Sequence, residues 1–403
     1  MKILHCCLSC FYNENYNYQE NFLPRYNKLD GNDVMIIAST ETFTNNNSLG
    51  FCEPIDHLNE DGIRVVRVPY RIIINKKVSS KLRAYVGVYK LIEEFAPDVI
   101  LFHGIGAWEL KNVVRYVKRH PGTKLYVDTH ASYMNSGTNF VSRILLHKLY
   151  YKSIIKKALP YVQKILCIGV EEKIFAHDIY GIDDNDLELY TLGGEIIPDD
   201  KYNSKRQATR KALNITDSQI LFVHSGKFVK GNMDNDLFGG NIEAEEVSKY
   251  NCGKQTRELL RAFESVADDS FRLIIAGTFA DNLKDEALEL ISRDSRIEYV
   301  GWKSGDELLD ILCAADVYLQ PGTHSTTLQN AMCLRCAVMA RPYSTYRYIL
   351  SDKAWMVMNE KDIKNALEQI HANHAIVEKK RTDAFNQAKE LLDYNVKAAR
   401  LYV

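Results

Sequence analysis

Residues 307–340 read ELLDILCAADVYLQPGTHSTTLQNAMCLRCAVMA, and this stretch alternates helical with strand-like hydrophobic spacing. Helical spacing covers 306–314 and 326–334, and each of these segments is followed by a short apolar run, at 316–319 and at 337–340. Strands separated by helices of this length form parallel β-α-β units. The stretch therefore predicts a doubly wound α/β sheet.

The same alternation extends along the rest of the chain, with a long interruption over 228–253. A hinge is expected at 192–200, where Gly193, Gly194 and Pro198 cluster. A chain of 403 residues is the usual length for two domains. We therefore expect an N-terminal domain over 1–194, a second domain over 195–380 and a terminal helix over 381–403 that packs back on the first domain. The expected strands are 2–8, 33–38, 63–68, 99–102, 124–127, 164–168, 220–224, 271–275, 297–300, 316–319, 337–340 and 355–358. The expected helices of the first half are 18–29, 82–95, 108–119 and 140–159, with a polar surface excursion over 45–61.

The composition narrows the class of protein. The net charge is −1, so no basic field favours nucleic acid as a partner, and no apolar run is long enough to cross a bilayer. The N-terminal run resembles a first strand more than a signal peptide, so we expect a cytoplasmic protein with reduced cysteines. Two cysteine pairs, Cys7 with Cys10 and Cys333 with Cys336, have zinc-like spacing, but buried small residues are the favoured interpretation there.

Two lysines stand where an anion could bind. Ser225, Gly226 and Lys227 follow the strand at 220–224, and Lys254 opens the next helix. Glycine permits close backbone approach, a helix N-terminus favours anions and lysine supplies charge, which together suit a diphosphate. The competing interpretation is that these are ordinary surface lysines beside loops.

The loop after the strand at 316–319 is the second candidate. Thr326 and Gln329 match a capping box, which predicts a helix start at Thr326 with its free N–H groups facing a ligand. An ordinary strand–loop–helix junction would have the same composition.

The pieces LIIAG, IEYVGW, ELLDILCAADVYLQPG and LQNAMCLRCAVMA together resemble the donor-binding domain of family 4 glycosyltransferases of the GT-B fold. In the first half, Asp128-Thr129-His130 resembles the acceptor-side motif of these enzymes, and 18–26 resembles the first helix of a bacterial subgroup that makes surface polysaccharides. The resemblance implies two Rossmann-like domains that face a central cleft. It also implies transfer of a hexose-type sugar, with retention, from a nucleotide diphosphate sugar to a glycan or lipid-linked acceptor.

The resemblance assigns roles to particular residues. His130, Asp128, Lys227 and Lys254 are the expected catalytic residues, and His130 is expected to bind the transferred sugar or the acceptor. The expected donor-binding residues are Ser225, Gly226, Trp302, Gly322, His324, Ser325, Thr326, Thr327 and Asn330. Because lysines and a helix N-terminus can stabilise the leaving diphosphate, we expect neither a metal ion nor another cofactor.

The sequence also departs from the family. Many relatives carry two glutamates that this chain replaces with Gly322 and Asn330. Such a chain is either a subgroup with different donor contacts, which we favour, or an inactive relative. A non-catalytic sugar-nucleotide-binding subunit and a nucleotide-sugar epimerase therefore remain alternatives. A Rossmann oxidoreductase has little support, because no G-x-G-x-x-G opens a helix after either first strand.

One segment of the sequence bears on where in the cell the protein acts. No acidic residue lies between Asp128 and Glu171, and the helix around 141–158 interleaves lysines with leucine, isoleucine and tyrosine. A basic amphipathic helix can bind the anionic inner face of a membrane, which would suit a lipid-linked acceptor. A helix packed on the sheet with a solvated basic face also explains the pattern and is the favoured interpretation.

Overall fold

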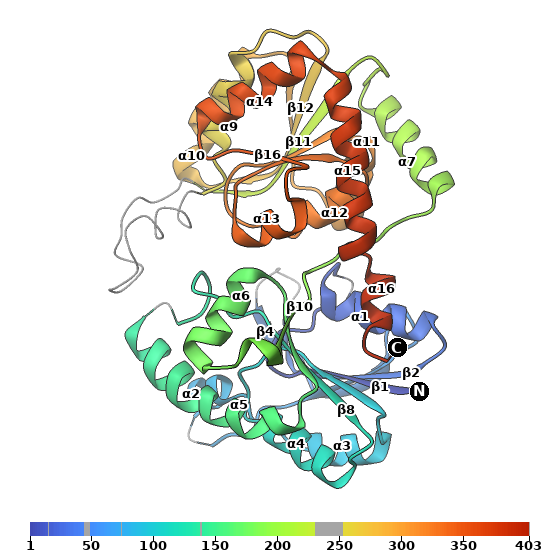
Figure 1. The fold of residues 1–403 in the computed structure, drawn as a ribbon, viewed down its shortest axis with the longest axis vertical. Coiled ribbons are helices and arrows are strands. Elements are labelled where there is room, and N and C mark those ends of the chain that lie inside the picture. The colour runs from blue at the N-terminus through green and yellow to red at the C-terminus, as the bar shows by residue number, and fades with distance from the viewer. Residues whose placement is uncertain (15, 44–48, 74, 138, 230–252, 403) are drawn as a thin grey trace. The chain divides into compact units, whose positions relative to one another are not determined.

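The computed structural model describes residues 1–403 except 15, 44–48, 74, 138, 230–252 and 403 (Figure 1). The chain forms two compact units. Unit 1 comprises Met1–Thr191 together with Tyr394–Val403, and unit 2 comprises Leu192–Asp393. Only the last helix, α16 (Tyr394–Ala399), therefore returns to the first unit, whereas α15 (Ala375–Leu391) belongs to unit 2.

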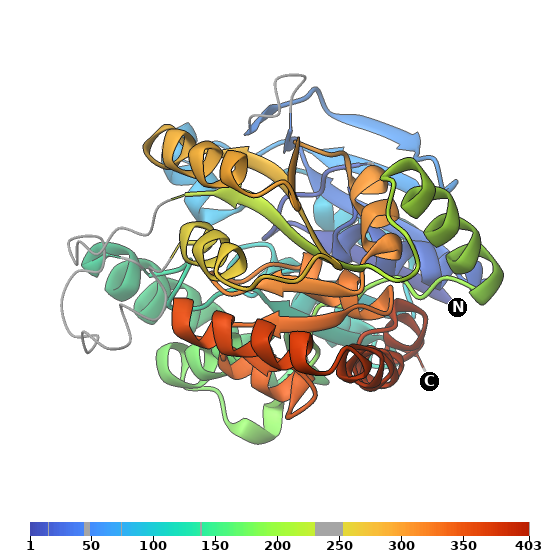
Figure 2. The same cartoon turned by 90° about the horizontal axis from the view of Figure 1, so that it is seen from above.

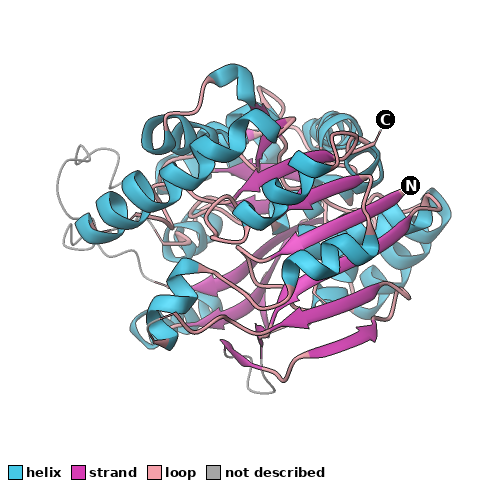
Figure 3. Ribbon diagram, turned by 90° about the horizontal axis from the view of Figure 1, so that it is seen from below, coloured by secondary structure: helices cyan, strands magenta, loops and turns pink. Residues whose placement is uncertain are grey.

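Unit 1 is built on an eight-stranded sheet in the order β10-β9-β8-β7-β1-β2-β6-β5 (Figure 3). Neighbouring strands are parallel except for β5, which pairs antiparallel with β6 at the edge. The strands are β1 (Lys2–Cys7), β2 (Asp33–Ser39), β5 (Ile55–Leu58), β6 (Arg64–Val68), β7 (Val99–Phe102), β8 (Lys124–Thr129), β9 (Lys164–Cys167) and β10 (Leu187–Leu189). Successive strands run outward in both directions from β1 and β7, so the topological switch point of this sheet lies between those two strands.

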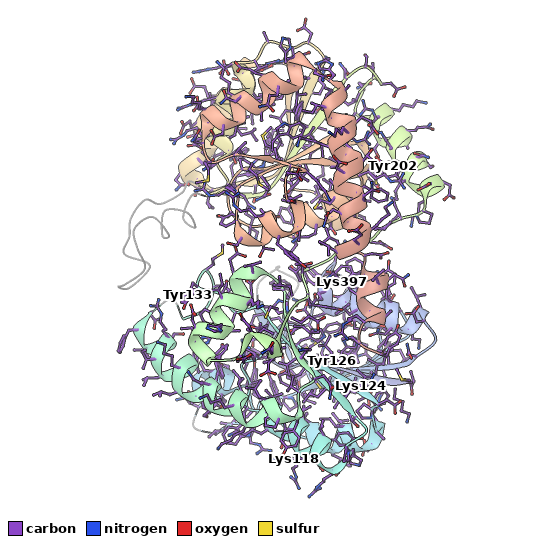
Figure 4. All side chains as sticks on the ribbon, in the orientation of Figure 1. Lys118, Lys124, Tyr126, Tyr133, Tyr202 and Lys397 are labelled. Atoms are coloured by element: carbon purple, nitrogen blue, oxygen red, sulfur yellow. The ribbon has the colours of Figure 1, made fainter. Side chains whose placement is uncertain are left out.

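The strands of unit 1 bury alternate side chains on opposite faces. One face, with Leu4 of β1, packs against α3 (Val88–Phe95), α4 (Leu110–Arg119) and α5 (Lys152–Ala158). The other, with Ile3, packs against α1 (Gln19–Leu29) and α16. Figure 4 labels Tyr126 of β8 and Lys397 of α16 in this second layer, where Phe22 also stacks on Tyr394 at 4.8 Å between ring centroids. The remaining helical segments are α2 (Lys76–Leu82), η1 (Ser142–Tyr151), η2 (Leu159–Tyr161), α6 (Val170–Phe175), η3 (Ala176–Tyr180) and η4 (Asp184–Asp186).

Unit 2 is a six-stranded, fully parallel sheet in the order β13-β12-β11-β14-β15-β16, with its switch point between β11 and β14. Its helices form two layers (Figure 2). One layer is α9 (Thr256–Glu264), α10 (Asp281–Arg293) and α14 (Glu360–Ala372). The other is α7 (Asp199–Ala212), α11 (Gly305–Ala314), α12 (Thr327–Cys333), α13 (Ser344–Leu350) and α15. The strands are β11 (Ile220–Phe228), β12 (Phe271–Phe279), β13 (Ile297–Gly301), β14 (Val317–Gln320), β15 (Ala337–Ala340) and β16 (Trp355–Met356).

Several expected elements differ in the structure. The helix expected over 82–95 is divided, because Arg83 and Gly87 both have left-handed backbones, with φ of 53° and 82°. The helix expected over 140–159 begins as the π-helical η1 and becomes α-helical only in α5. The terminal helix expected over 381–403 is interrupted, because α15 ends at Leu391 and α16 begins at Tyr394. In each case the spacing of apolar residues located the helical region but did not reveal the interruption.

Short strands were also missed. The polar stretch expected to be a surface excursion contains β5 and β4 (Leu49–Phe51), and β4 pairs antiparallel with β3 (Glu41–Phe43). β10 was not expected, and β11 continues through Ser225, Gly226 and Lys227, which were expected to follow a strand. These segments are short or polar and carry weak periodicity. None of the helices in the described part of the chain is long and apolar enough to cross a bilayer.

Candidate functional site

The switch point of unit 2 brings the ends of β11 and β14 together. His224 of β11 pairs with Leu319 of β14, and the segments that follow contain most of the expected donor-binding residues. In open α/β sheets, ligands bind beyond the carboxyl ends of the strands at this point. The expected loop Ser225–Lys227 is a continuation of β11, paired with Ala276–Thr278 of β12.

Three glycines allow backbone segments to approach one another here. Gly226 and Gly277 face each other across β11 and β12 with φ of 141° and 151°, and a Cβ on Gly277 would lie 2.9 Å from the carbonyl carbon of Gly226. A Cβ on Gly322 would overlap the carbonyl oxygen of Gly253 and lie 2.5 Å from Cα of Lys254. The chain after β14 is thus packed directly on the segment that leads into α9. We call Gly226, Gly277, Gly322 and Lys254 the glycine cradle.

Lys254 supplies the positive charge of the glycine cradle. The residue is 8% exposed, and its Nζ donates long hydrogen bonds to the carbonyl oxygens of Thr323, at 3.4 Å, and His324, at 3.5 Å. A Cβ on Gly226 would lie 3.1 Å from its Cε, so the lysine stem passes directly over that glycine. A cation beside glycine backbone is the arrangement that suits a phosphate group. Lys227 is next to Gly226 on β11 and is exposed.

Tyrosines hold the loop between β14 and α12. The backbone N–H of Ser325 donates to the Tyr346 hydroxyl at 2.7 Å, and that hydroxyl donates to the Ser325 carbonyl oxygen at 3.1 Å. His324 stacks on Tyr346 at 4.6 Å and meets Tyr343 edge-on at 4.0 Å between ring centroids. Tyr318 bonds to Ser225 at 3.1 Å. Sequence reasoning missed all three tyrosines, because each resembles an ordinary core aromatic.

The capping box expected at Thr326 was wrong. Thr326 is helical, with φ −65° and ψ −18°, and its side chain makes no capping hydrogen bond. The N–H of Thr327 instead donates to Oγ of Ser325 at 3.4 Å. α12 has only seven residues, so we assign it a smaller electrostatic contribution than Lys254.

Two expected donor residues lie apart from the glycine cradle. Asn330 is on α12, where its Oδ1 would lie 2.9 Å from a Cβ placed on Gly194. Trp302 follows β13, which is two strands from β11, and is 60% exposed. The structure therefore gathers Ser225, Gly226, Lys254 and the loop from Gly322 to Thr327. Asn330 follows one helical turn later on α12, where its N–H donates to the Thr326 carbonyl oxygen at 3.4 Å, and Trp302 follows β13 at the same carboxyl edge of the parallel sheet.

A second polar cluster lies at the switch point of unit 1, centred on the buried carboxylate of Asp128. Asp128 accepts hydrogen bonds from Nδ1 of His103 at 2.7 Å and the backbone N–H of Gly104 at 2.6 Å. Nε2 of Gln19 donates to it at 3.2 Å, and Nε2 of His130 lies 3.4 Å away. The three donors come from α1 and from the end of β7, and His130, at the end of β8, lies within ion-pair distance. The sequence predicted His130 and Asp128, with His103 as a weaker candidate.

His130 lies at the accessible side of the Asp128 cluster. Its side chain is 31% exposed, and its Nε2 is 3.8 Å from Oε1 of Glu20. Burial lowers the pKa of His130, but the Asp128 carboxylate, with a smaller effect from Glu20, raises it to about 9. His130 is therefore a cation at neutral pH and can donate a hydrogen bond to a hydroxyl group.

Glu172, which the sequence did not single out, lies near His130. It is in the first turn of α6, just after β9, and burial and the neighbouring Glu171 raise its pKa to about 7, against weaker opposing effects that include His130 and the Ser132 hydroxyl. A carboxylate with a pKa near neutrality can exchange protons with a substrate. Its place after a strand of the sheet is the one signal that could have indicated it. No group of three or more His, Cys, Asp or Glu side chains in the described ranges is arranged to hold a metal ion.

Comparisons with known proteins agree on one fold. The family described as Glycosyl transferases group 1 matches residues 247–391, within unit 2. Similar solved structures include a glycosyltransferase from Rickettsia africae ESF-5, at 10% identity over 99% of this chain and 96% of that one (TM-score 0.65). Another is Anabaena Alr3699/HepE in complex with UDP, at 11% identity over 99% and 98% (TM-score 0.62).

A third similar structure is WaaG, a glycosyltransferase involved in lipopolysaccharide biosynthesis, at 13% identity over 99% of both chains (TM-score 0.59). Among curated protein sequences, none matches this chain. The fold is therefore GT-B, an α/β fold of Rossmann-like units, and the chain resembles glycosyltransferases of group 1.

Proposed function

We propose that this chain, whose second unit matches glycosyl transferases of group 1, transfers a sugar from a nucleoside diphosphate donor to an acceptor. The observation that carries the proposal is the glycine cradle, a lysine held over close-packed glycine backbone at the switch point of unit 2. The presence of UDP in the similar HepE structure supports the same class of donor.

The proposed chemistry is stabilisation of a leaving group. Cleavage of the bond between sugar and diphosphate places negative charge on the diphosphate, and Lys254 would neutralise it from a fixed position. Lys227, exposed beside Gly226, would add charge from the solvent side. Fixed cations perform the role that a divalent ion has in other sites, so we propose a metal-independent reaction. We also propose that the transferred group is a hexose and that its anomeric configuration is retained.

The packing at Gly322 accounts for one missing glutamate. The space that a side chain at this position would need is filled by the backbone of Gly253 and Lys254. A glutamate there would be incompatible with the observed position of Lys254. This replacement favours a subgroup with altered donor contacts over a family member that has lost its site, because the cation remains in place.

The test is donor turnover by matched lysine variants. Purified protein is supplied with UDP-, GDP- and dTDP-sugars in EDTA, with water as the acceptor of the released sugar, and release of the nucleoside diphosphate is measured. Lys254→Ala should lower kcat/KM by well over tenfold, since a preorganised anion-stabilising group contributes a few kcal/mol. Lys361→Ala, at an exposed lysine of α14, should leave turnover unchanged. Equal turnover by Lys254→Ala and the parent would remove Lys254 from the mechanism.

The acceptor is proposed to be a glycan or a lipid-linked glycan, bound at unit 1 near His130. The helix formed by η1 and α5 supports a lipid-linked acceptor. Phe140, Val141, Leu145 and Leu149 are exposed along it, whereas Tyr151, Ile154 and Ile155 are buried against the sheet. Lys148, Lys156 and Lys157 are exposed along the same helix. Exposed apolar side chains among lysines suit the surface of an anionic membrane on the cytoplasmic side.

Flotation with vesicles of phosphatidylglycerol and phosphatidylcholine tests this surface. The double change Leu145→Ser with Leu149→Ser should reduce the bound fraction several-fold, because apolar burial contributes to interfacial binding. Leu29→Ser with Leu58→Ser, at equally exposed leucines elsewhere in unit 1, is the matched control. Equal flotation of both double variants, or no flotation of the parent, would remove the membrane from the proposal.

A further inference from the structure

A continuous chain of buried hydrogen bonds connects helix α16 to Asp128. Nδ2 of Asn27 donates to the backbone carbonyl oxygen of Ala398 in α16 at 3.2 Å, and Oδ1 of Asn27 lies 2.8 Å from Nε2 of His5. Nδ1 of His5 lies 3.0 Å from Nε2 of His103, whose Nδ1 is bonded to Asp128. The side chains of His5, Asn27, His103 and Asp128 are all fully buried.

The carbonyl group at the α16 end fixes the direction of the first two bonds in this chain. A carbonyl oxygen only accepts, so Asn27 must present its NH2 group to Ala398 and its oxygen to His5. Nε2 of His5 must then carry a proton.

His5 bonds to an amide oxygen, whereas His103 bonds to the Asp128 carboxylate, so the positive charge belongs on His103 and burial keeps His5 neutral. A neutral imidazole carries only one proton, so Nδ1 of His5 accepts from His103. His103 therefore donates from Nε2 to His5 and from Nδ1 to Asp128, which requires protons on both nitrogens.

The charges around His103 agree with this arrangement. Burial opposes its charge, but Cys7 of β1 and Asp128 of β8, with Glu20 of α1, raise its pKa to about 10. Burial and the neighbouring His103 lower the pKa of His5 to about 3, against weaker effects of Asn27 and Asp128. His130 is also close to His103, and the positive charge of His103 lowers the pKa of His130.

We infer that His103 is a positioning residue of the acceptor side, held as an imidazolium by the hydrogen-bond chain that begins at Ala398 in α16. Bonded to Oδ2 of Asp128, it leaves Oδ1 to the Gly104 N–H and to His130, which would orient His130 for the transferred sugar or acceptor. The part that concerns His130 rests on the proposed transferase function. The protonation of His103 does not, so the two can fail separately.

The first test is 15N NMR of the full chain with labelled histidines. At pH 8 the resonances of His103 should show both nitrogens protonated, and those of His5 a single proton on Nε2. A neutral His103 at this pH would overturn the inference, whether or not the protein transfers sugar. This measurement needs neither a variant nor activity.

The second test is the titration of His130 in a variant. In His103→Gln the nearby positive charge is removed, so the pKa of His130 should rise by about one unit. His147→Gln, at a buried histidine of unit 1 that bonds to Tyr180 instead, should leave that titration unchanged. A role of His103 in packing alone predicts no change in either folded variant, and that result would overturn the positioning role.

Discussion

At the scale of single residues, the glycines of unit 2 shape the candidate site because they have no Cβ. Gly226 and Gly277 keep β11 and β12 in register while their φ angles lie where L-residues are strained. A side chain at Gly277 would also occupy the volume of the Gly226 carbonyl group. Only glycine at these two positions therefore permits the two backbones to approach this closely.

The corresponding prediction is that Gly277→Ala destabilises the protein. The added Cβ is forced against backbone and the φ angle is unfavourable for alanine, so the free energy of unfolding should fall by at least about 2 kcal/mol. Gly122→Ala is the matched control, because a Cβ there meets nothing within 4 Å. Urea unfolding of both variants measures the difference, and similar midpoints would show that the two strands can separate without cost.

Residue-level features were only partly predictable from sequence. Gly226 and Lys254 were identified because glycine and lysine beside a strand end suit a phosphate whatever surrounds them. The packing of Gly322 on Lys254 and the stacking of His324 on Tyr346 depend on contacts between segments far apart in the chain. His5, a polar residue within the apolar run of β1, was a signal that the sequence offered and that was not used.

At the scale of elements, the buried histidines of unit 1 connect β1, β7 and β8, and Asn27 of α1 connects them to α16. The pKa of His103 is raised to about 10 and that of His130 to about 9, from an ordinary value of 6.5. A group whose pKa is raised by folding stabilises the folded state below its unfolded pKa and loses that contribution as the pH rises through its folded pKa.

The free energy of unfolding should therefore decrease as the pH rises from about 7 to 10. Denaturant unfolding at a series of pH values measures this slope. In His103→Gln the slope should be shallower, whereas His147→Gln should keep it, since burial lowers the pKa of His147 to about 4, outside this range. A stability that is constant to pH 10 would contradict the assignment of charge to His103.

Elements were predicted well where periodicity is strong and poorly where it is not. The core strands β1, β7, β8 and β14 were located from short apolar runs alone. The division between α2 and α3 depends on left-handed backbones at Arg83 and Gly87, which a pattern of apolar residues does not encode. β10 and the strands of the polar stretch are stabilised by pairing with neighbours, so their own residues gave little signal.

At the scale of the whole molecule, the two units share a plan and divide the chemistry. Each is a mainly parallel sheet with one switch point, and one cluster of polar residues lies beside each switch point. Unit 2 has the cation Lys254 over glycine backbone, and unit 1 has the partly exposed, protonated His130 beside the buried carboxylate of Asp128. This arrangement is consistent with the proposed reaction between an anionic donor and a hydroxyl-bearing acceptor. The repeated β-α alternation allowed the shared plan to be predicted from the sequence.

The central claim is that a nucleoside diphosphate binds at the glycine cradle of unit 2. Its most direct test is thermal unfolding in EDTA with UDP, GDP and dTDP added in turn, since a ligand that binds only the folded state raises Tm. We predict that at least one of them raises the Tm of the parent and of Lys361→Ala, and that the shift is lost in Lys254→Ala. A shift of equal size in Lys254→Ala, or none with any nucleotide in the parent, would contradict the account.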